Sequence, residues 1–334
     1  MSFNEFPQSV DGLEIQLWET YEPFYNDLLD RQLSNGDLRP WLDDWSALSS
    51  LVWEAGALIY IKKSLDTADE AAEQAFLDFV TDVQPQASVA DQALKERFLD
   101  SEPDGQDFAD LALTIREMRN QADLFRDENV PLQTELAKLA NEYDKITGAM
   151  TADWEGEEKN LSQLEVLLQQ RDRDVRERAW QQIMDLWLAD RDQLNQLYVQ
   201  MLDLRQQLAD NAGLPDYRAY AFREKNRFDY TPEDCFTFHN AIEEVVAPFA
   251  RKIYEKRRQR LALAALRPWD VEVDSSGAPP LKPYSGQDEL IQHTSNIFEA
   301  VDPALAGHYA TMDEADLMDL DTRSGKALGG YCSP

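Results

Sequence analysis

The most informative stretch of the chain lies close to its last residue and reads Leu317-Met318-Asp319-Leu320-Asp321-Thr322-Arg323-Ser324-Gly325-Lys326-Ala327-Leu328-Gly329-Gly330-Tyr331-Cys332. Apolar and acidic residues alternate in its first half, and small and charged residues follow, so the pattern predicts a strand that enters a tight turn. The pair Gly329 and Gly330 would let a second backbone approach closely, because neither residue places a side chain in the way. A plain turn or bulge explains the pair as well, and both interpretations stay open at this point.

Most of the remaining chain is predicted to be helical, because apolar residues recur at intervals of three and four rather than two. The clearest apolar stripe consists of Val175, Ala179, Ile183, Leu186, Leu194, Leu197, Met201, Leu204 and Leu208. Gly213 and Pro215 supply a stop for this helix. The stripe itself is typical of a buried helix face.

A second long helix is predicted to begin at Thr231, which can cap it, and to run to about Leu266. A further helix is expected around residues 287–301. Short strands are expected near residues 269–273 and 317–331, where polar and apolar residues alternate. The sequence therefore predicts a mainly α fold with a few short strands.

The chain is strongly acidic, with 32 Lys and Arg against 64 Asp and Glu and a formal charge of -32. This charge repels phosphate backbones and anionic lipids, so neither nucleic acid nor membrane is expected as a partner. The first residues lack a secretion signal, and the apolar run from Ala55 to Ile61 is far shorter than the roughly 20 residues that a membrane span needs. Cys235 and Cys332 are too few for a disulfide framework. We therefore expect a cytoplasmic protein with a solvated acidic surface.

A zinc hydrolase most readily takes two ligands from one helix, as histidines four residues apart with a glutamate between them. The chain has three histidines, His239, His293 and His308, and no two of them are four residues apart. One trio of metal-binding residue types does share a predicted helix face, namely Cys235, His239 and Glu243. At about 1.5 Å of rise per residue, the outer two members lie roughly 12 Å apart along the helix axis. They are too far apart to share one ion, so no metal site is expected there.

Two weaker catalytic candidates remain. Cys235 lies near the start of its predicted helix with His239 one turn away, an arrangement that can lower the pKa of a thiol. Asp319 and Asp321 share one face of the predicted strand and could act as a carboxylate pair. The simpler interpretations are a packed cysteine and two solvent-facing carboxylates. The glycine-rich phosphate loops and the Gly-x-Ser-x-Gly elbow are absent from the sequence.

Five stretches carry a resemblance to a known family, and they are Leu124–Leu132, Lys145–Met150, Asn226–Asp234, Arg267–Val271 and Leu317–Cys332. In this order they resemble segments of the oligoendopeptidase F family of thimet-oligopeptidase-like zinc metallopeptidases. The last stretch is similar to the family pattern Asp-Leu-x-x-Arg-x-Gly-Lys-x-x-Gly-Gly-Tyr-Cys, which in the family shortly precedes the zinc helix. Because the five stretches span most of the chain, the resemblance does not rest on one motif.

The resemblance implies an elongated, two-lobe helical oligopeptidase fold with a deep channel, in which zinc hydrolyses short peptides. The zinc ligands of the family and its motif glutamate have no counterpart in this chain, so the cofactor is expected to be the zinc of the full-length family with no ligand here. No catalytic residue is assigned. The resemblance does assign a lining of the substrate cleft, which is Gly325, Lys326, Gly329, Gly330 and Tyr331. Leu328 stands where the family often has proline.

A compositional shift near residues 154–158 gives a provisional boundary between an N-terminal helical lobe, residues 1–160, and the first part of the peptidase catalytic domain, residues 161–334. We expect the chain to stop before the zinc motif, to be incomplete at its C-terminus and to be inactive by itself. Its expected partners are short peptides and a C-terminal catalytic segment. The alternative is a stand-alone helical peptide-binding or regulatory protein derived from the same family.

Overall fold

The computed structural model describes residues 3, 6–7, 9–33, 37–101, 103 and 106–333. Helices dominate it, and the strands form one two-stranded antiparallel sheet. Contacts within the chain group it into two compact units, each built from separate segments. Unit 1 comprises Met1–Thr147, Asp192–Phe236 and Ala327–Pro334, and unit 2 comprises Gly148–Arg191 and Thr237–Lys326.

The elements that lie mainly in unit 1 are η2 (Trp18–Thr20), α1 (Glu22–Asp30), α2 (Leu38–Leu65), α3 (Glu70–Asp78), η3 (Phe79–Val83), α4 (Gln84–Asp100), η4 (Gln106–Leu111), α5 (Ala112–Leu124), α6 (Asn129–Gly148), α9 (Arg191–Asn211) and α10 (Tyr217–Glu224). Unit 2 holds β1 (Thr151–Trp154), β2 (Glu157–Asn160), α7 (Leu161–Glu165), η5 (Val166–Gln169), α8 (Arg173–Ala189), η7 (Pro268–Asp270), α13 (Gln287–Val301) and α14 (Pro303–Glu314). One run continues from α11 (Pro232–Ala241) through η6 (Ile242–Val246) to α12 (Ala247–Arg260).

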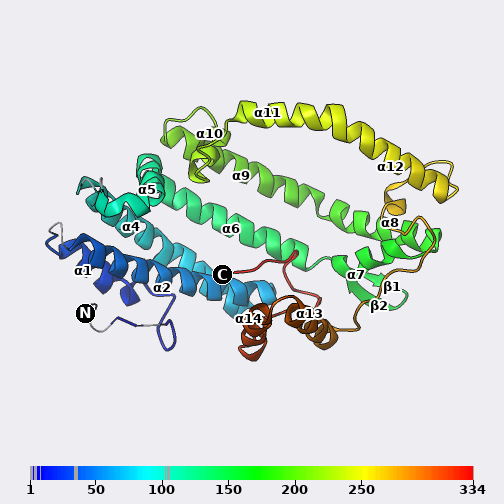
Figure 1. Cartoon of the computed structure of the whole chain (residues 1–334), viewed down its shortest axis with the longest axis horizontal. Helices are drawn as coiled ribbons and strands as arrows, with labels where there is room; N and C mark the ends of the chain where they lie inside the picture. Colours follow the sequence, from blue (N-terminus) through cyan, green and yellow to red (C-terminus); the bar gives the residue numbers. More distant parts are fainter. Residues whose placement is uncertain are drawn as a thin grey trace. The chain divides into compact units, whose positions relative to one another are not determined.

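Unit 1 is organised around α2, whose buried residues recur at helical intervals. Helix α1 packs against both α2 and α4, and α2 packs against α3 (Figure 1). Aromatic rings fill the space between these helices, with Trp41 of α2 lying 5.4 Å from Trp45 and 6.4 Å from Phe98 between ring centroids. Burial of large rings contributes most of the hydrophobic stabilisation of such a core. The result is a packed helical core on which other segments can be positioned.

A buried ion cluster organises unit 2. The carboxylate of Asp270 is completely buried and accepts hydrogen bonds from Arg173 at 3.0 Å and from Arg176 at 2.9 Å. Both arginines lie in α8, and Arg176 is only 3% exposed. The ring of Trp269 packs 5.2 Å from Trp180 of the same helix. Because these charges are hydrogen-bonded as well as paired, they fix the loop around η7 against α8.

The predicted helical class is confirmed, and so are two of the predicted helix positions. Helix α11 begins where Thr231 was expected to cap it, since the Thr231 hydroxyl accepts the Asp234 N–H at 3.2 Å while the Asp234 carboxylate accepts the Thr231 N–H at 2.8 Å. Helix α13 spans the predicted residues 287–301. The Thr231 helix ends earlier than expected, at Arg260 rather than Leu266, because the chain turns through a positive φ at Ala262.

The predicted helix across Val175 to Leu208 is wrong in one respect, because it is broken into α8 and α9 at Asp190. The apolar stripe continues on both sides of the break and gives no sign of it. None of the helices in the described part of the chain combines the length and the apolar character needed to cross a bilayer.

Both predicted strand positions are wrong. Among the described residues, 269–273 form the 3₁₀ turn of η7 followed by bends, and 317–331 form turns, bends and irregular chain without a partner strand. A strand requires a neighbour for its backbone groups, whereas here side chains satisfy them. The Arg176 side chain donates to the carbonyl of Trp269 at 2.8 Å, and the Lys326 amine donates to the carbonyl of Asp321 at 2.8 Å. The provisional domain boundary at residue 160, which follows the hairpin of β1 and β2, stays a prediction.

Candidate functional site

The first two residues of the predicted cleft lining, Gly325 and Lys326, lie in unit 2. The Gly325 N–H donates to the carbonyl of Gly148 at 3.2 Å, and Lys326 stabilises a turn. The Lys326 amine donates to the carbonyl of Asp319 at 2.9 Å and to that of Asp321 at 2.8 Å, and it pairs with the Asp319 carboxylate at 3.1 Å. An ammonium group has three donors, and each one finds an acceptor here. The charge of Lys326 therefore serves the local fold, and we regard its role toward a ligand as indirect.

Asp319 is the anion at the centre of this turn. Its carboxylate accepts two hydrogen bonds from Arg323, at 2.9 Å and 2.7 Å. The hydrogen bonds from Arg323, followed by that from Lys326, lower the pKa of Asp319 to about 2. Asp319 therefore stays ionised under all ordinary conditions. The structure thus does not support the predicted pairing of Asp319 with Asp321 for proton transfer, since a general acid or base must change its charge near the working pH.

The two glycines of the pair differ in their backbone. Gly329 has a φ of +89°, which a residue with a side chain adopts only at a cost, so the turn itself requires glycine there. Gly330 does not have a positive φ, and a Cβ built on it meets no atom within 4 Å. Nothing in the described part of the chain therefore requires glycine at residue 330. Turn geometry explains Gly329, and close approach by a further molecule would explain Gly330.

Tyr331 holds the end of this segment on helix α2. Its hydroxyl lies 2.5 Å from the hydroxyl of Ser64, and its ring centroid lies 5.7 Å from that of Tyr60. The carbonyl of Ser64 also accepts the Ala327 N–H at 2.9 Å. Residues 327–331 are thus attached at both ends to one turn of α2, while Gly329 and Gly330 between them remain exposed.

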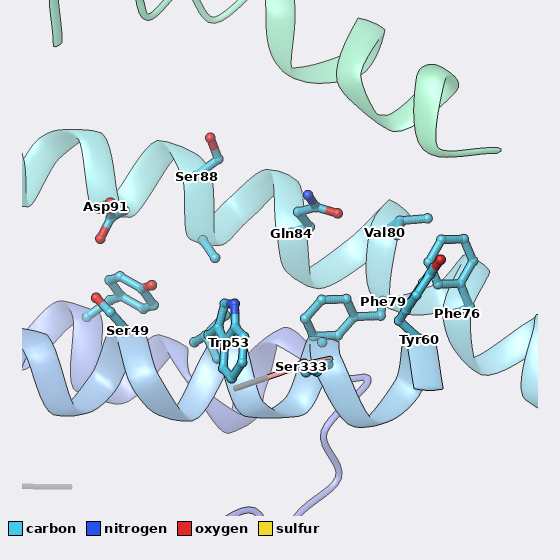
Figure 2. Close-up of a pocket in the computed structure, with 15 residues that line it drawn as sticks. Ser49, Trp53, Tyr60, Phe76, Phe79, Val80, Gln84, Ser88, Asp91 and Ser333 are labelled. Carbon is cyan, nitrogen blue, oxygen red and sulfur yellow. The ribbon is translucent and has the colours of Figure 1, made fainter. Parts of the chain in front are cut away.

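A cavity of about 550 Å³ lies beside this attachment, entirely within unit 1 (Figure 2). Aromatic side chains dominate its lining, and they are Tyr25, Trp53, Tyr60, Phe76 and Phe79. Polar groups come from Ser49, Gln84 and Ser88, and from Asp91 at one end. Ser333, which follows the glycine pair, borders the same cavity. An apolar cavity with a few polar groups has the composition of a ligand site.

The other predicted candidates are not brought together into a site. Cys235 is half-buried and Cys332 is exposed, and both are free thiols. Within the described residues, no three His, Cys, Asp or Glu side chains are grouped so that they could hold a metal ion. The trio Cys235, His239 and Glu243 is included in that result. The donor groups of the described chain therefore do not fit a zinc ion.

The terminal motif predicts Tyr331 and the glycines as cleft residues, but no motif points to the residues that hold them in place. Ser64 and Tyr60 lie one turn apart near the end of α2, within an ordinary amphipathic pattern. No local signal distinguishes them, because their partner Tyr331 lies 267 positions away from Ser64. The aromatic cavity residues likewise read as core positions in the sequence.

Comparison with protein-family models gives two matches in this chain. Residues 166–299 match the model described as peptidase family M3, and residues 13–106 match the model described as the peptidase M3 N-terminal domain. A comparison with curated protein sequences gives no match.

Solved structures of similar fold include three peptidases. PZ peptidase A with a bound inhibitor superposes with a TM-score of 0.87 at 23% identity, over 99% of this chain and 58% of that protein. A protein of Bacillus anthracis str. Ames described as an oligoendopeptidase F superposes with a TM-score of 0.87 at 19% identity, over 100% of this chain and 61% of that protein. Oligoendopeptidase F of Enterococcus faecium gives a TM-score of 0.57 at 14% identity, over 90% of this chain and 66% of that protein.

At these identities the superpositions establish the fold, and the chain spans about three fifths of the length of the first two proteins. The family models establish descent, because both halves of the chain match models of one family in the expected order. This chain belongs to peptidase family M3.

Proposed function

We propose that this chain is the peptide-holding N-terminal part of a zinc-dependent oligoendopeptidase that hydrolyses short, unstructured peptides. The observation that carries the proposal is the exposed glycine pair at Gly329 and Gly330, which the contact between Tyr331 and Ser64 attaches to helix α2. Membership of a peptidase family supports a peptide as the ligand. We place the protein in the cytoplasm as part of the same proposal, which its free cysteines support.

The glycine pair suits a peptide backbone rather than a side chain. An extended peptide can pair its N–H and C=O groups with an exposed, extended segment, and this pairing adds affinity with little dependence on sequence. Residues 330–333 carry no helix, turn or bend and have no partner strand, so their backbone is open to pairing, and Gly330 leaves the space above its Cα empty. A side chain at residue 330 would fill that space and keep the peptide away.

The chemical step is assigned to no residue of this chain. Peptidase family M3 is generally zinc-dependent, but the donor groups of the described residues do not fit a zinc ion. We therefore propose that the metal site belongs to sequence outside these 334 residues, consistent with the 58% of PZ peptidase A that this chain spans. The contribution of this chain is to bind and orient the peptide.

Peptide binding tests the proposal. A fluorescent, unstructured octapeptide is titrated into the wild-type chain and into Gly330→Val, and fluorescence polarisation gives the two dissociation constants. We expect the wild-type chain to bind and the variant to bind about tenfold more weakly, because loss of one or two backbone hydrogen bonds removes about 1–2 kcal/mol. Equal binding by both proteins, or no binding by either, would contradict the proposal.

Binding does not separate a peptidase fragment from a stand-alone binding protein, so a second measurement is needed. The chain is mixed with the complementary segment of PZ peptidase A, which carries the part that this chain does not span. Cleavage of an internally quenched peptide by the mixture, and by neither component alone, supports the peptidase. Saturable peptide binding without cleavage in any mixture supports the stand-alone alternative.

A further inference from the structure

The cavity beside Tyr331 has a carboxylate at one end that the rest of the protein only partly compensates. The Asp91 carboxylate accepts a hydrogen bond from the indole N–H of Trp45 at 2.6 Å. Its nearest cation, the Lys95 amine, is 3.8 Å away, which is too far for a hydrogen bond. The Asp91 side chain is 33% exposed, so a ligand can reach it. One anionic group therefore remains available at the end of an apolar cavity.

The walls of the cavity are suited to an apolar chain that carries a positive charge. Trp53 and Tyr60 of α2 lie opposite α4, and Phe76 and Phe79 continue the aromatic lining (Figure 2). Aromatic faces attract cations as well as apolar groups. Figure 2 shows Asp91 at one end of this row and Tyr60 with Phe76 at the other. A ligand that lies along the row would place its charged end at Asp91.

The cavity is continuous with the segment that holds the glycine pair. Ser333 borders the cavity, and the Tyr331 ring packs on Tyr60, which is itself part of the lining. A peptide paired with the backbone at Gly330 therefore lies next to the cavity opening. The side chain that such a peptide can direct into the cavity has to match its aromatic walls and its one carboxylate.

We propose that this cavity is a specificity pocket that takes an arginine or lysine side chain of the bound peptide, with the aliphatic stem along Trp53 and the charged head at Asp91. Long basic side chains combine an apolar stem with a cationic tip, as this cavity requires. The inference rests on the proposed function, since it takes the ligand to be a peptide. It adds a preference for basic peptides, which nothing in the family assignment specifies.

Two electrostatic properties support this occupant. Burial raises the pKa of Asp91, although the Trp45 hydrogen bond and Lys95 oppose the shift, so its ionised form still lacks stabilisation that a ligand cation would provide. The formal charge of -32 over the whole chain also favours the approach of basic peptides over acidic ones.

Isosteric peptides test the pocket on the unmodified protein. Three capped alanine pentapeptides carry arginine, citrulline or glutamate at the central position, and their dissociation constants are measured by isothermal titration calorimetry. Citrulline has the shape of arginine without its charge. We expect the arginine peptide to bind about tenfold more tightly than the citrulline peptide, as for one charge-assisted hydrogen bond, and the glutamate peptide to bind most weakly.

Matched variants then locate the effect. Asp91→Asn retains an oxygen for the Trp45 indole and should remove the preference for arginine over citrulline. Trp53→Ala should weaken both peptides, and because Trp53 is 53% exposed this change does not disturb the core. Asp100→Asn, an exposed change on the same helix, is the control and should leave the preference intact.

The outcomes separate this inference from the proposed function. Equal affinities for the arginine and citrulline peptides, or a preference that survives in Asp91→Asn, would overturn the pocket. If the arginine and citrulline peptides bind the wild-type chain equally well, and both bind Gly330→Val more weakly, the peptide-holding function stands without the pocket. If the preference for the arginine peptide depends on Asp91 but is unchanged in Gly330→Val, the pocket stands and the glycine segment takes no part in binding. Absence of binding for all three peptides would overturn the pocket, and the octapeptide titration would still test the proposed function separately.

Discussion

The hydroxyl of Tyr331 lies 2.5 Å from the hydroxyl of Ser64, although the two residues are 267 positions apart in the sequence. Ser64 is buried and belongs to the last turn of α2, and its carbonyl also binds the Ala327 N–H. This single residue therefore fixes both ends of the segment that carries Gly329 and Gly330. The position of the glycine pair depends on a contact that only the folded chain creates.

Removal of this contact should loosen the segment. We expect Tyr331→Phe to cost about 0.5–1.5 kcal/mol, the usual net value of one hydrogen bond. Amide hydrogen exchange at Ala327 is the measurement, because its N–H is bound to Ser64. Ser64→Ala should have a similar effect, and the double variant should add little. Tyr198→Phe, at an exposed position on α9, is the control. Unchanged exchange at Ala327 in Tyr331→Phe, Ser64→Ala and the double variant would contradict the proposed attachment.

The two glycines should respond differently to alanine. Gly329→Ala places a side chain at a φ of +89° and should cost about 1–2 kcal/mol, seen as faster exchange at Ala327 or a lower free energy of unfolding. Gly330→Ala should leave both quantities unchanged, because its Cβ has open space around it. Equal destabilisation by the two substitutions would show that Gly330 is required by the fold, and the argument for a bound backbone would lose its basis.

The turn at Asp319 should depend on pH in a defined direction. Arg323 and then Lys326 lower the pKa of Asp319 from 3.8 to about 2 in the folded chain. A lowered pKa in the folded state means that the stabilisation is fully present above 3.8 and is lost as the pH falls towards 2. The difference in unfolding free energy between wild type and Asp319→Asn should therefore be constant near neutral pH and shrink over this range. A carboxyl titration by NMR with its midpoint at or above 3.8 would contradict the ion pairs.

The ion cluster of unit 2 should be sensitive to loss of its anion. Asp270→Asn leaves Arg173 and Arg176 beside a neutral group, and Arg176 is buried. Loss of one partner from a buried pair costs about 3–5 kcal/mol, which denaturant unfolding measures directly. Glu272→Gln, two residues away and exposed, should change stability by less than about 0.5 kcal/mol. Similar effects of the two substitutions would argue against the cluster as a stabilising feature.

The run of α11, η6 and α12 exposes a line of apolar side chains that should bind a hydrophobic dye. Phe238 is 65% exposed, Val245 is 68% exposed and Phe249 is 63% exposed, and they recur at intervals of seven and four residues. We expect the triple substitution of these residues by glutamate to reduce the fluorescence of a bound anilinonaphthalene sulfonate several-fold at unchanged stability. Dye binding that persists in the variant would place the apolar surface elsewhere.

Local features of the fold could be predicted from the sequence, because the interactions that determine them are short-range. The cap formed by Thr231 and Asp234 involves residues three apart, and helix α13 follows from its apolar spacing. The break at Asp190 could not be predicted, since the apolar stripe continues across it. The strand expected near residue 270 does not form. Asp270 instead accepts hydrogen bonds from two arginines of α8 that are far away in the sequence. Alternation of residue types does not reveal such long-range partners.

The candidate site likewise combines residues that a sequence motif predicts with contacts that only the folded chain creates. The terminal motif predicts a cleft lining of Gly325, Lys326, Gly329, Gly330 and Tyr331, and this assignment stays a prediction. The structure adds that Lys326 binds Asp319 in the turn. The attachment of Tyr331 to Ser64 of α2, and the cavity beside it, depend on packing between segments that are far apart in sequence. Those parts of the site had no signature that could be recognised before the structure.

Photo-cross-linking shows where on the chain a peptide binds. An unstructured peptide with a central benzoylphenylalanine is irradiated with the wild-type chain, and the cross-linked residues are mapped by mass spectrometry. We expect cross-links to residues 327–333 and to the cavity residues of α2, with competition by unlabelled peptide and a marked loss in Gly330→Val. Cross-links that map instead to α13 and α14, or that Gly330→Val leaves unchanged, would contradict the assignment of this segment as the peptide-binding wall.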